Sequence, residues 1–224
     1  MKIIGVTESV VQYLRVHIIT GDLGAGQRLN EIELSSSLNV SRPPIREAFR
    51  VLENESLAVS VPRKGCFVTE VTMEDCHNIF EVRAMIECFA IDLLASKKIS
   101  HIPRAKSVLK NTSKLSLPPE KDAYERYRYL RSIADFHIQI VKQSGNARLI
   151  SLYDRIFPSL ARYQSLYTYI PGLMDNSHQE HEDILQLITL GKYAKAKKML
   201  GEHINSFIKL IKERVMAYEK VPKI

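Results

Sequence analysis

The segment NVSRPPIREAFRVL (Asn39–Leu52) determines how this 224-residue sequence is interpreted. Its apolar residues recur every three or four positions, as on one face of an α-helix, yet Pro43 and Pro44 stand near its start. Proline costs little in a first helical turn, because the N–H groups there have no partner inside the helix. We therefore predict a helix that begins abruptly at this pair, with Arg42 just ahead of it and Arg46 in its first turns.

The flanking segments complete a DNA-binding pattern. Before the helix, NEIELSSSLNV predicts a shorter helix with Asn30 as its N-cap, followed by a tight turn. After it, LAVSVPRKGCFVTEV alternates β-branched residues around Arg63, Lys64 and Gly65, which predicts a hairpin. A helix-turn-helix presents the start of its second helix to the major groove, and the hairpin would be its wing. The alternative is a surface helix whose arginines only keep it solvated, and the turn and hairpin argue against it.

Composition narrows the class of protein but does not identify DNA binding. The net charge is +7, yet residues 1–72 contain eight basic and eight acidic residues. The prediction of DNA binding therefore depends on where particular arginines are placed, and not on the total charge. Three cysteines without metal-type spacing predict no disulfide framework and suit a cytoplasmic protein. No apolar stretch approaches the ~20 residues of a membrane span, and the first residues do not resemble a signal peptide. We expect no membrane partner.

From Thr72 the pattern changes to long amphipathic helices. The sequence TMED begins the first of them as a variant of the capping box, and stops at 145–146, 171–172 and 191 separate others. We predict a mainly α protein with two domains. Residues 1–72 would form a winged helix-turn-helix of helices plus a small β-hairpin, and residues 73–224 an all-α antiparallel bundle of about six helices.

Three histidines of the second half lie on separate predicted helices with apolar neighbours at helical spacing. They are His137, His181 and His203. Imidazoles from different helices of a bundle can converge and hold a divalent metal. Alternatively each is a buried histidine with an ordinary hydrogen-bond partner, which is the more frequent situation for a single residue of this kind.

Other candidates in this half have two interpretations each. Arg83 could bind the carboxylate of an anionic ligand in two hydrogen bonds, or pair with Glu87 one turn away. Asn146 follows Gly145 and indicates a helix end before it indicates a pocket residue. Three tyrosines could line a pocket or form a dimer face: Tyr163, Tyr167 and Tyr169.

Residues 7–71 resemble the winged helix-turn-helix of the GntR family of bacterial transcription regulators. The resemblance rests on the G-x-L-x-x-G-x-x-L pattern of residues 21–29, on the segment around the two prolines and on the glycine of the wing. It departs at Ser56, where the family usually has glycine, and we expect this to cost little. The resemblance implies DNA contacts from Ser41, Arg42, Pro43, Arg46, Arg63, Lys64 and Gly65.

Residues 76–212 resemble the FCD effector-binding domain of the FadR subgroup, through EVRAMIE, FHIQIVKQSGNARLI and EHEDILQLITLGKYAKAKKMLGEHI. In many such domains an Asp and three His hold a metal that receives a small carboxylate, and His137, His181 and His203 match the three His. The position of the Asp is Ile133 here, and Asp135 points about 200° away from His137 on a helix.

The loss of that Asp leaves several arrangements open. Three imidazoles could still bind zinc or nickel more weakly, with water or the effector as fourth ligand, or hydrogen-bond an anion without metal. His178, one turn before His181, could replace the missing ligand or lie on the surface.

We therefore expect a homodimeric transcription regulator, a repressor, whose binding to a double-stranded DNA operator responds to a small organic acid, and not an enzyme. The alternative is a metal-dependent hydrolase or lyase built on the three histidines, which needs a general base near the metal. Glu180, Glu182 and Glu202 are adjacent in sequence to these histidines, but such neighbours are expected to face another direction.

Overall fold

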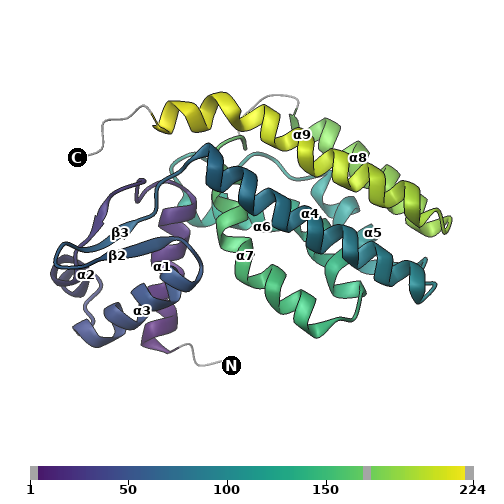
Figure 1. Cartoon of the computed structure of the whole chain (residues 1–224). Coiled ribbons are helices and arrows are strands. Elements are labelled where there is room, and N and C mark those ends of the chain that lie inside the picture. Colours follow the sequence, from purple (N-terminus) through teal and green to yellow (C-terminus); the bar gives the residue numbers. More distant parts are fainter. Residues whose placement is uncertain (1–4, 169–172, 220–224) are drawn as a thin grey trace.

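The computed structural model describes residues 5–168 and 173–219, which form a mainly helical protein with one small sheet (Figure 1). This confirms the predicted fold class. In chain order the elements are α1 (Val6–Ile19), β1 (Arg28–Leu29), α2 (Glu31–Ser37), α3 (Arg42–Asn54), β2 (Ala58–Val61), β3 (Gly65–Val68), α4 (Met73–Ser96), α5 (Pro103–Thr112), α6 (Ala123–Gln143), α7 (Ala147–Ser165), α8 (Leu173–Thr189) and α9 (Tyr193–Glu219).

Helices α2 and α3 form the predicted helix-turn-helix. The Asn30 side chain caps α2 by accepting a hydrogen bond of 2.9 Å from the backbone N–H of Ile32. In the turn, Asn39 has a φ of 52°, and the N–H of Val40 reaches back to the carbonyl of Ser35 at 3.1 Å. Asparagine tolerates this left-handed backbone better than most residues, so the chain reverses within a few residues.

Helix α3 buries its apolar face and exposes its first turn. Ile45, Ala48, Phe49 and Leu52 are buried. Arg42 is the first residue of the helix and does not precede it, so our placement of that residue was wrong by one position. The residue before a proline is only biased away from helical angles, and helix limits commonly vary by one residue.

The wing is larger than the predicted hairpin. Strands β2 and β3 form that hairpin, with Val59 opposite Phe67. Strand β1 adds a third, antiparallel strand on the other side of β3, with Leu29 opposite Cys66. Two residues are too few to show the alternating pattern by which a strand is recognised, so sequence periodicity could not reveal it.

The end of α3 shows why Ser56 is an unusual residue at its position. Ser56 has a φ of 57°, in the left-handed region. The N–H of Leu57 bonds to the carbonyl of Leu52 at 2.9 Å, and that of Ser56 to Glu53 at 3.0 Å. These are the two bonds of a Schellman motif, in which the left-handed residue is usually glycine. From this backbone we now expect serine to cost about 1 kcal/mol relative to glycine, more than the sequence suggested.

Replacing Ser56 with glycine is expected to raise the free energy of unfolding by about 0.5–1 kcal/mol, because glycine adopts this backbone without strain. Urea unfolding followed by circular dichroism would measure it. As a control, Ser113 caps α5 with a right-handed φ of −60°, so Ser113→Gly should lower stability. Equal effects of the two changes would contradict this explanation.

The described residues of the second half contain six helices, α4 to α9, in agreement with the predicted bundle of about six. The Thr72 side chain caps α4 by accepting a hydrogen bond from the N–H of Asp75 at 3.1 Å. Helix α4 runs through the middle of this half and packs on α9, α6 and α7 (Figure 1). Within the described residues, no helix combines the length and hydrophobicity that crossing a membrane requires.

The two halves are joined by a continuous apolar core and by polar contacts of α7. The buried hydrophobic residues of both halves belong to one cluster. The hydroxyl of Ser159 donates a hydrogen bond of 2.8 Å to the carbonyl of Glu55, just after α3. The guanidinium of Arg162 donates to the side chain and carbonyl of Thr69, just after β3, at 2.7 and 2.8 Å. Helix α7 therefore holds both the recognition helix and the wing.

Candidate DNA-binding surface and metal centre

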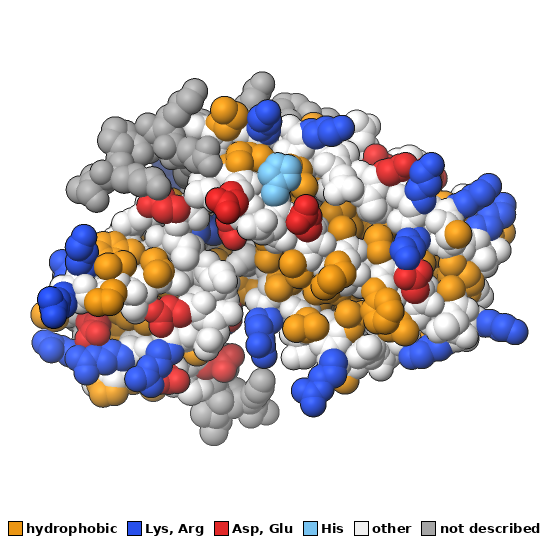
Figure 2. Space-filling view, in the orientation of Figure 1, with side chains coloured by type: hydrophobic (Ala, Val, Ile, Leu, Met, Phe, Trp, Pro, Cys, Tyr) orange, Lys and Arg blue, Asp and Glu red, His pale blue; other side chains and the backbone are white. Residues whose placement is uncertain are grey.

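The first turn of α3 lies open at one end of the molecule. Ser41, Arg42, Pro43 and Arg46 are all exposed. Figure 2 shows basic side chains gathered at this end, which Figure 1 identifies as α2, α3 and the hairpin. The wing residues of the prediction, which are also exposed, are Arg63, Lys64 and Gly65. The structure thus places all seven candidate residues on the accessible surface.

The two prolines leave the hydroxyl of Ser41 without a capping role. Ser41 is the N-cap of α3, but its side chain makes no capping hydrogen bond. An N-cap side chain accepts from the second or third N–H of its helix, and those residues are Pro43 and Pro44, which have none. The hydroxyl therefore stays available to a group outside the protein.

Arg46 is exposed but held in place by the preceding helix. Its Nε lies 2.9 Å from a carboxylate oxygen of Glu31, the first residue of α2. The guanidinium side chain is 61% exposed. A surface pair of this kind contributes little to stability, so its main effect is to orient the arginine.

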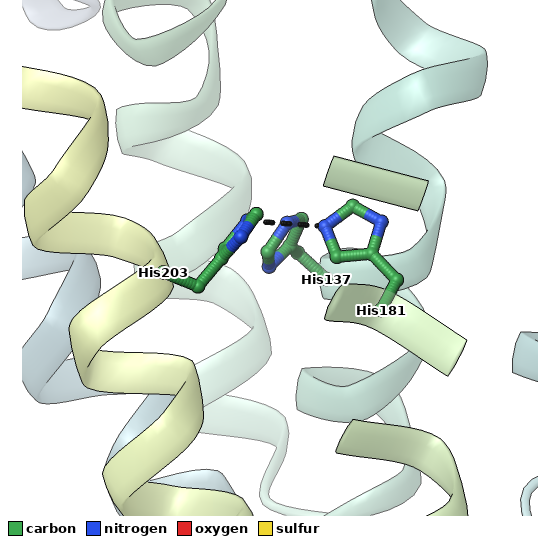
Figure 3. A group of neighbouring side chains, drawn as sticks. All are labelled: His137, His181 and His203. Carbon is green, nitrogen blue, oxygen red and sulfur yellow. Dashed lines mark hydrogen bonds between the residues drawn. The ribbon is translucent and has the colours of Figure 1, made fainter. Parts of the chain in front are cut away.

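The three predicted histidines converge from three helices. His137 lies on α6, His181 on α8 and His203 on α9, and one nitrogen of each lies within 4.8 Å of the others. The Nε2 atoms of His181 and His203 are 3.1 Å apart. Figure 3 shows the three rings directed to one small space, with the hydrogen bond between His181 and His203 drawn as a dashed line.

Carboxylates hold two of these rings from the opposite side. Glu87 on α4 lies 2.6 Å from Nδ1 of His137, and Glu180 on α8 lies 2.5 Å from Nδ1 of His203. Metal-binding histidines usually have such a partner, which orients the ring and leaves Nε2 for the ion. The prediction that Glu180 faces another direction is wrong, because α9 packs beside α8 and brings His203 to it.

Two of the three imidazoles are in the protonation state that a metal requires. Burial lowers the pKa of His137 to about 4 and outweighs the opposing charge of Glu87. Burial also lowers the pKa of His181 well below its ordinary value, and neighbouring histidines add to the effect. Both rings are therefore neutral near pH 7, so a metal would not have to displace protons from them.

An isoleucine occupies the position of the family's aspartate, and its side chain lies at the candidate metal site. Ile133 lines the cavity beside the three histidines, one turn before His137. Asp135 accepts a hydrogen bond from Gln139 instead. His178 lines the cavity but lies 3.4 Å from Glu182, so it is paired elsewhere. The donor set is three imidazoles with room for a further ligand, which suits zinc or nickel.

A cavity of about 480 Å³ opens beside the histidines, with walls from α4 to α9. Arg83 is part of its wall, but its Nε lies 2.7 Å from Glu87, so the ion pair that the sequence left as an alternative is present. Glu87 also accepts a hydrogen bond of 2.8 Å from Tyr153. Burial would raise the pKa of Glu87, but Arg83 and His137 hold it below its ordinary range.

Of the remaining candidate residues, some line the cavity and others do not. Asn146 caps α7, where its side chain accepts from two backbone N–H groups at 3.1 and 3.2 Å, and it is not part of the cavity wall. Its placement among the effector contacts is therefore corrected: it begins a helix. Tyr167 lines the cavity, whereas the hydroxyl of Tyr163 bonds to Thr72 between the two halves. Tyr169 lies outside the described residues.

Comparisons with known proteins match both halves of the chain. The family model "Bacterial regulatory proteins, gntR family" matches residues 6–68, and the FCD domain model matches residues 78–206. The chain belongs to the GntR family and carries an FCD domain. Three of its relatives are an HTH-type regulator of Bacillus subtilis (27% identity; 86% of this chain, 84% of that protein), the gluconate operon repressor of Bacillus licheniformis (28%; 73% and 69%) and the repressor GlaR of Escherichia coli (25%; 90% and 94%).

Solved structures show the same fold. A GntR regulator from Rhodococcus sp. RHA1 superposes with a TM-score of 0.73 at 21% identity, covering 92% of this chain and 96% of that one. McbR/YncC of E. coli gives 0.70 at 17% identity, covering 95% and 99%. The chain is a DNA-binding transcriptional regulator of this family, which is the function that its exposed recognition helix suggests.

Proposed function

We propose that this regulator is a cytoplasmic repressor whose operator binding responds to a small organic acid. Residues 1–72 form the DNA-binding domain in this proposal, and residues 73–224 bind the effector and form the homodimer. The observation that carries it is the exposed first turn of α3 at the free end of the molecule. Two such ends in a dimer would contact successive major grooves of a near-palindromic operator.

Each candidate residue has a role that follows from its chemistry. Arg46 offers two parallel donors to a guanine edge, and the free hydroxyl of Ser41 suits a phosphate. Arg42 and Pro43 would lie against the DNA backbone at the start of α3. At the wing, the cations of Arg63 and Lys64 would neutralise neighbouring phosphates, and Gly65 permits the turn with a φ of 110°.

Replacing Arg46 with alanine tests this assignment. We expect a loss of about 1–3 kcal/mol in binding to the DNA upstream of the protein's own gene, because a base contact would disappear. Gel shift or fluorescence anisotropy at two salt concentrations would measure it, and binding of the unchanged protein should weaken steeply as salt rises.

A matched control comes from the other half. Arg128 lies on α6, is 70% exposed and pairs with Glu125, so Arg128→Ala removes the same charge outside the recognition helix and the wing. It should leave operator affinity nearly unchanged. If Arg46→Ala binds the operator like the unchanged protein, the recognition helix has been assigned wrongly.

The effector part of the proposal rests on the cavity and its histidines. His137, His181 and His203 would hold zinc or nickel, and the ion would bind and attract the carboxylate of the effector. Arg83 is proposed to contact the same carboxylate. Since Glu87 already balances the charge of Arg83, we assign most of the attraction for an anion to the metal.

An exposed apolar stripe on α4 supports the homodimer. Val82, Met85 and Phe89 lie three and four residues apart, and Met85 and Phe89 are 63% and 47% exposed. Leu152 of the neighbouring α7 is also exposed, and Figure 2 shows apolar side chains gathered over these two helices. Exposed apolar surface of this kind is typical of protein–protein contacts.

The hydrolase or lyase alternative finds no support. Glu180 is bonded to His203, and Glu182 and Glu202 pair with His178 and Lys198 near the surface. The relatives reported above are transcription regulators. We therefore propose no second function.

A further inference from the structure

One buried polar group in the cavity wall lacks a partner. Gln164 is 5% exposed and lines the cavity from the last turns of α7. Its carbonyl oxygen Oε1 is buried and has no hydrogen-bond partner among the described residues. A buried oxygen without a partner is costly, and in native proteins such a group calls for an explanation, of which a bound donor is one.

The missing partner has to be a hydrogen-bond donor. An amide oxygen only accepts, and the side chain of Gln164 is part of the cavity wall. The only Lys or Arg in the described cavity wall is Arg83, which is paired with Glu87. A ligand whose carboxylate lies at the histidines would therefore meet an acceptor, not a cation, at Gln164.

Gln164 also lies beside the contacts that hold the DNA-binding half. Its neighbour Tyr163 bonds through its hydroxyl to Asp75 at 2.8 Å and to the carbonyl of Thr72 at 3.2 Å. Arg162, two residues earlier, bonds to Thr69 at the end of the wing. The same helical turn therefore faces the cavity on one side and the DNA-binding half on the other.

We propose that Gln164 selects the effector: it accepts a hydrogen bond from a hydroxyl or ammonium group that the acid carries away from its carboxylate. Because α7 holds the recognition helix and the wing, occupation of Gln164 shifts the placement of the DNA-binding half. This inference rests on the proposed function, since it takes the histidines as the site of the carboxylate. It adds the second group that the effector must have.

The first test needs no ligand. Gln164→Met keeps the size of the side chain and removes the unpartnered oxygen, so the ligand-free protein should unfold about 2–4 °C higher. Gln139→Met is the matched control, because Gln139 donates a hydrogen bond of 2.9 Å to Asp135 and its loss should lower the midpoint. A lower midpoint for Gln164→Met would mean that the amide is satisfied in the folded protein, and would overturn the proposal.

The second test uses zinc-loaded protein and four acids, butyrate and its 2-, 3- and 4-hydroxy derivatives, in calorimetric titrations. We expect at least one hydroxy acid to bind about tenfold more tightly than butyrate, and Gln164→Met to remove that difference while butyrate binding stays the same. Gln139→Met should keep the difference.

Operator binding, measured in parallel, distinguishes a failure of the role of Gln164 from a failure of the proposed function. Four acids that bind equally well would overturn the role of Gln164 and leave the proposed function intact. Four acids that do not bind would contradict both this inference and the organic-acid part of the proposed function, and the regulator itself would stand if operator binding persists.

Discussion

Replacing Glu87 with alanine is expected to lower the free energy of unfolding by about 3–5 kcal/mol. Glu87 is fully buried and accepts hydrogen bonds from Arg83, His137 and Tyr153. Its removal would leave the guanidinium of Arg83, itself 3% exposed, as an uncompensated charge in the core. Guanidinium unfolding at neutral pH, with linear extrapolation to water, would measure the loss.

Two further variants separate charge from packing. The double change Arg83→Met with Glu87→Leu removes both charges and should recover most of the lost stability. Tyr153→Phe removes one donor and should cost only about 1 kcal/mol. A double variant as unstable as Glu87→Ala would show that the packing of this site, and not the unpaired charge, causes the loss.

Short-range patterns in the sequence were sufficient to predict the helix-turn-helix of the DNA-binding half. The two prolines, the periodic apolar face of α3 and the turn before it are all recorded within about twenty residues. They predicted the exposed arginines because a helix has only one buried face. The left-handed backbone of Ser56 was not foreseen, and β1 was missed. Neither a single backbone angle nor a two-residue strand produces a periodic sequence pattern.

Only half of the candidate metal centre could be predicted from the sequence. Helical spacing marked His137, His181 and His203 as inward-facing, and resemblance to the FCD domain joined them into one site. Their carboxylate partners could not be found in this way, because Glu87 lies 50 residues from His137 and Glu180 lies 23 residues from His203. Such contacts follow from how α4, α8 and α9 pack, which the periodicity of one helix does not determine.

The residues of the cavity wall could likewise be predicted only in part from the sequence. Arg83 was recognised as either an anion contact or an ion pair, and only the fold could decide that Glu87 holds it. Gln164 was missed altogether. A glutamine on an amphipathic helix resembles any other polar residue, and its importance appears only when its buried oxygen is seen to lack a partner.

Replacing His203 with alanine is expected to abolish metal binding, and replacing Ile133 with aspartate to strengthen it. Losing a direct ligand should cost at least as much affinity as losing an outer partner, which is about 10–100-fold. Aspartate at Ile133 would stand one turn before His137 and supply a charged oxygen to a set of three imidazoles. Titration with zinc in competition with a chromogenic chelator would measure both changes.

His178→Ala provides the control, because this histidine lines the same cavity yet pairs with Glu182 and should leave zinc affinity nearly unchanged. Protein purified without chelator and supplied with zinc should carry one ion per chain by elemental analysis. If it carries none, the three histidines do not form a metal site.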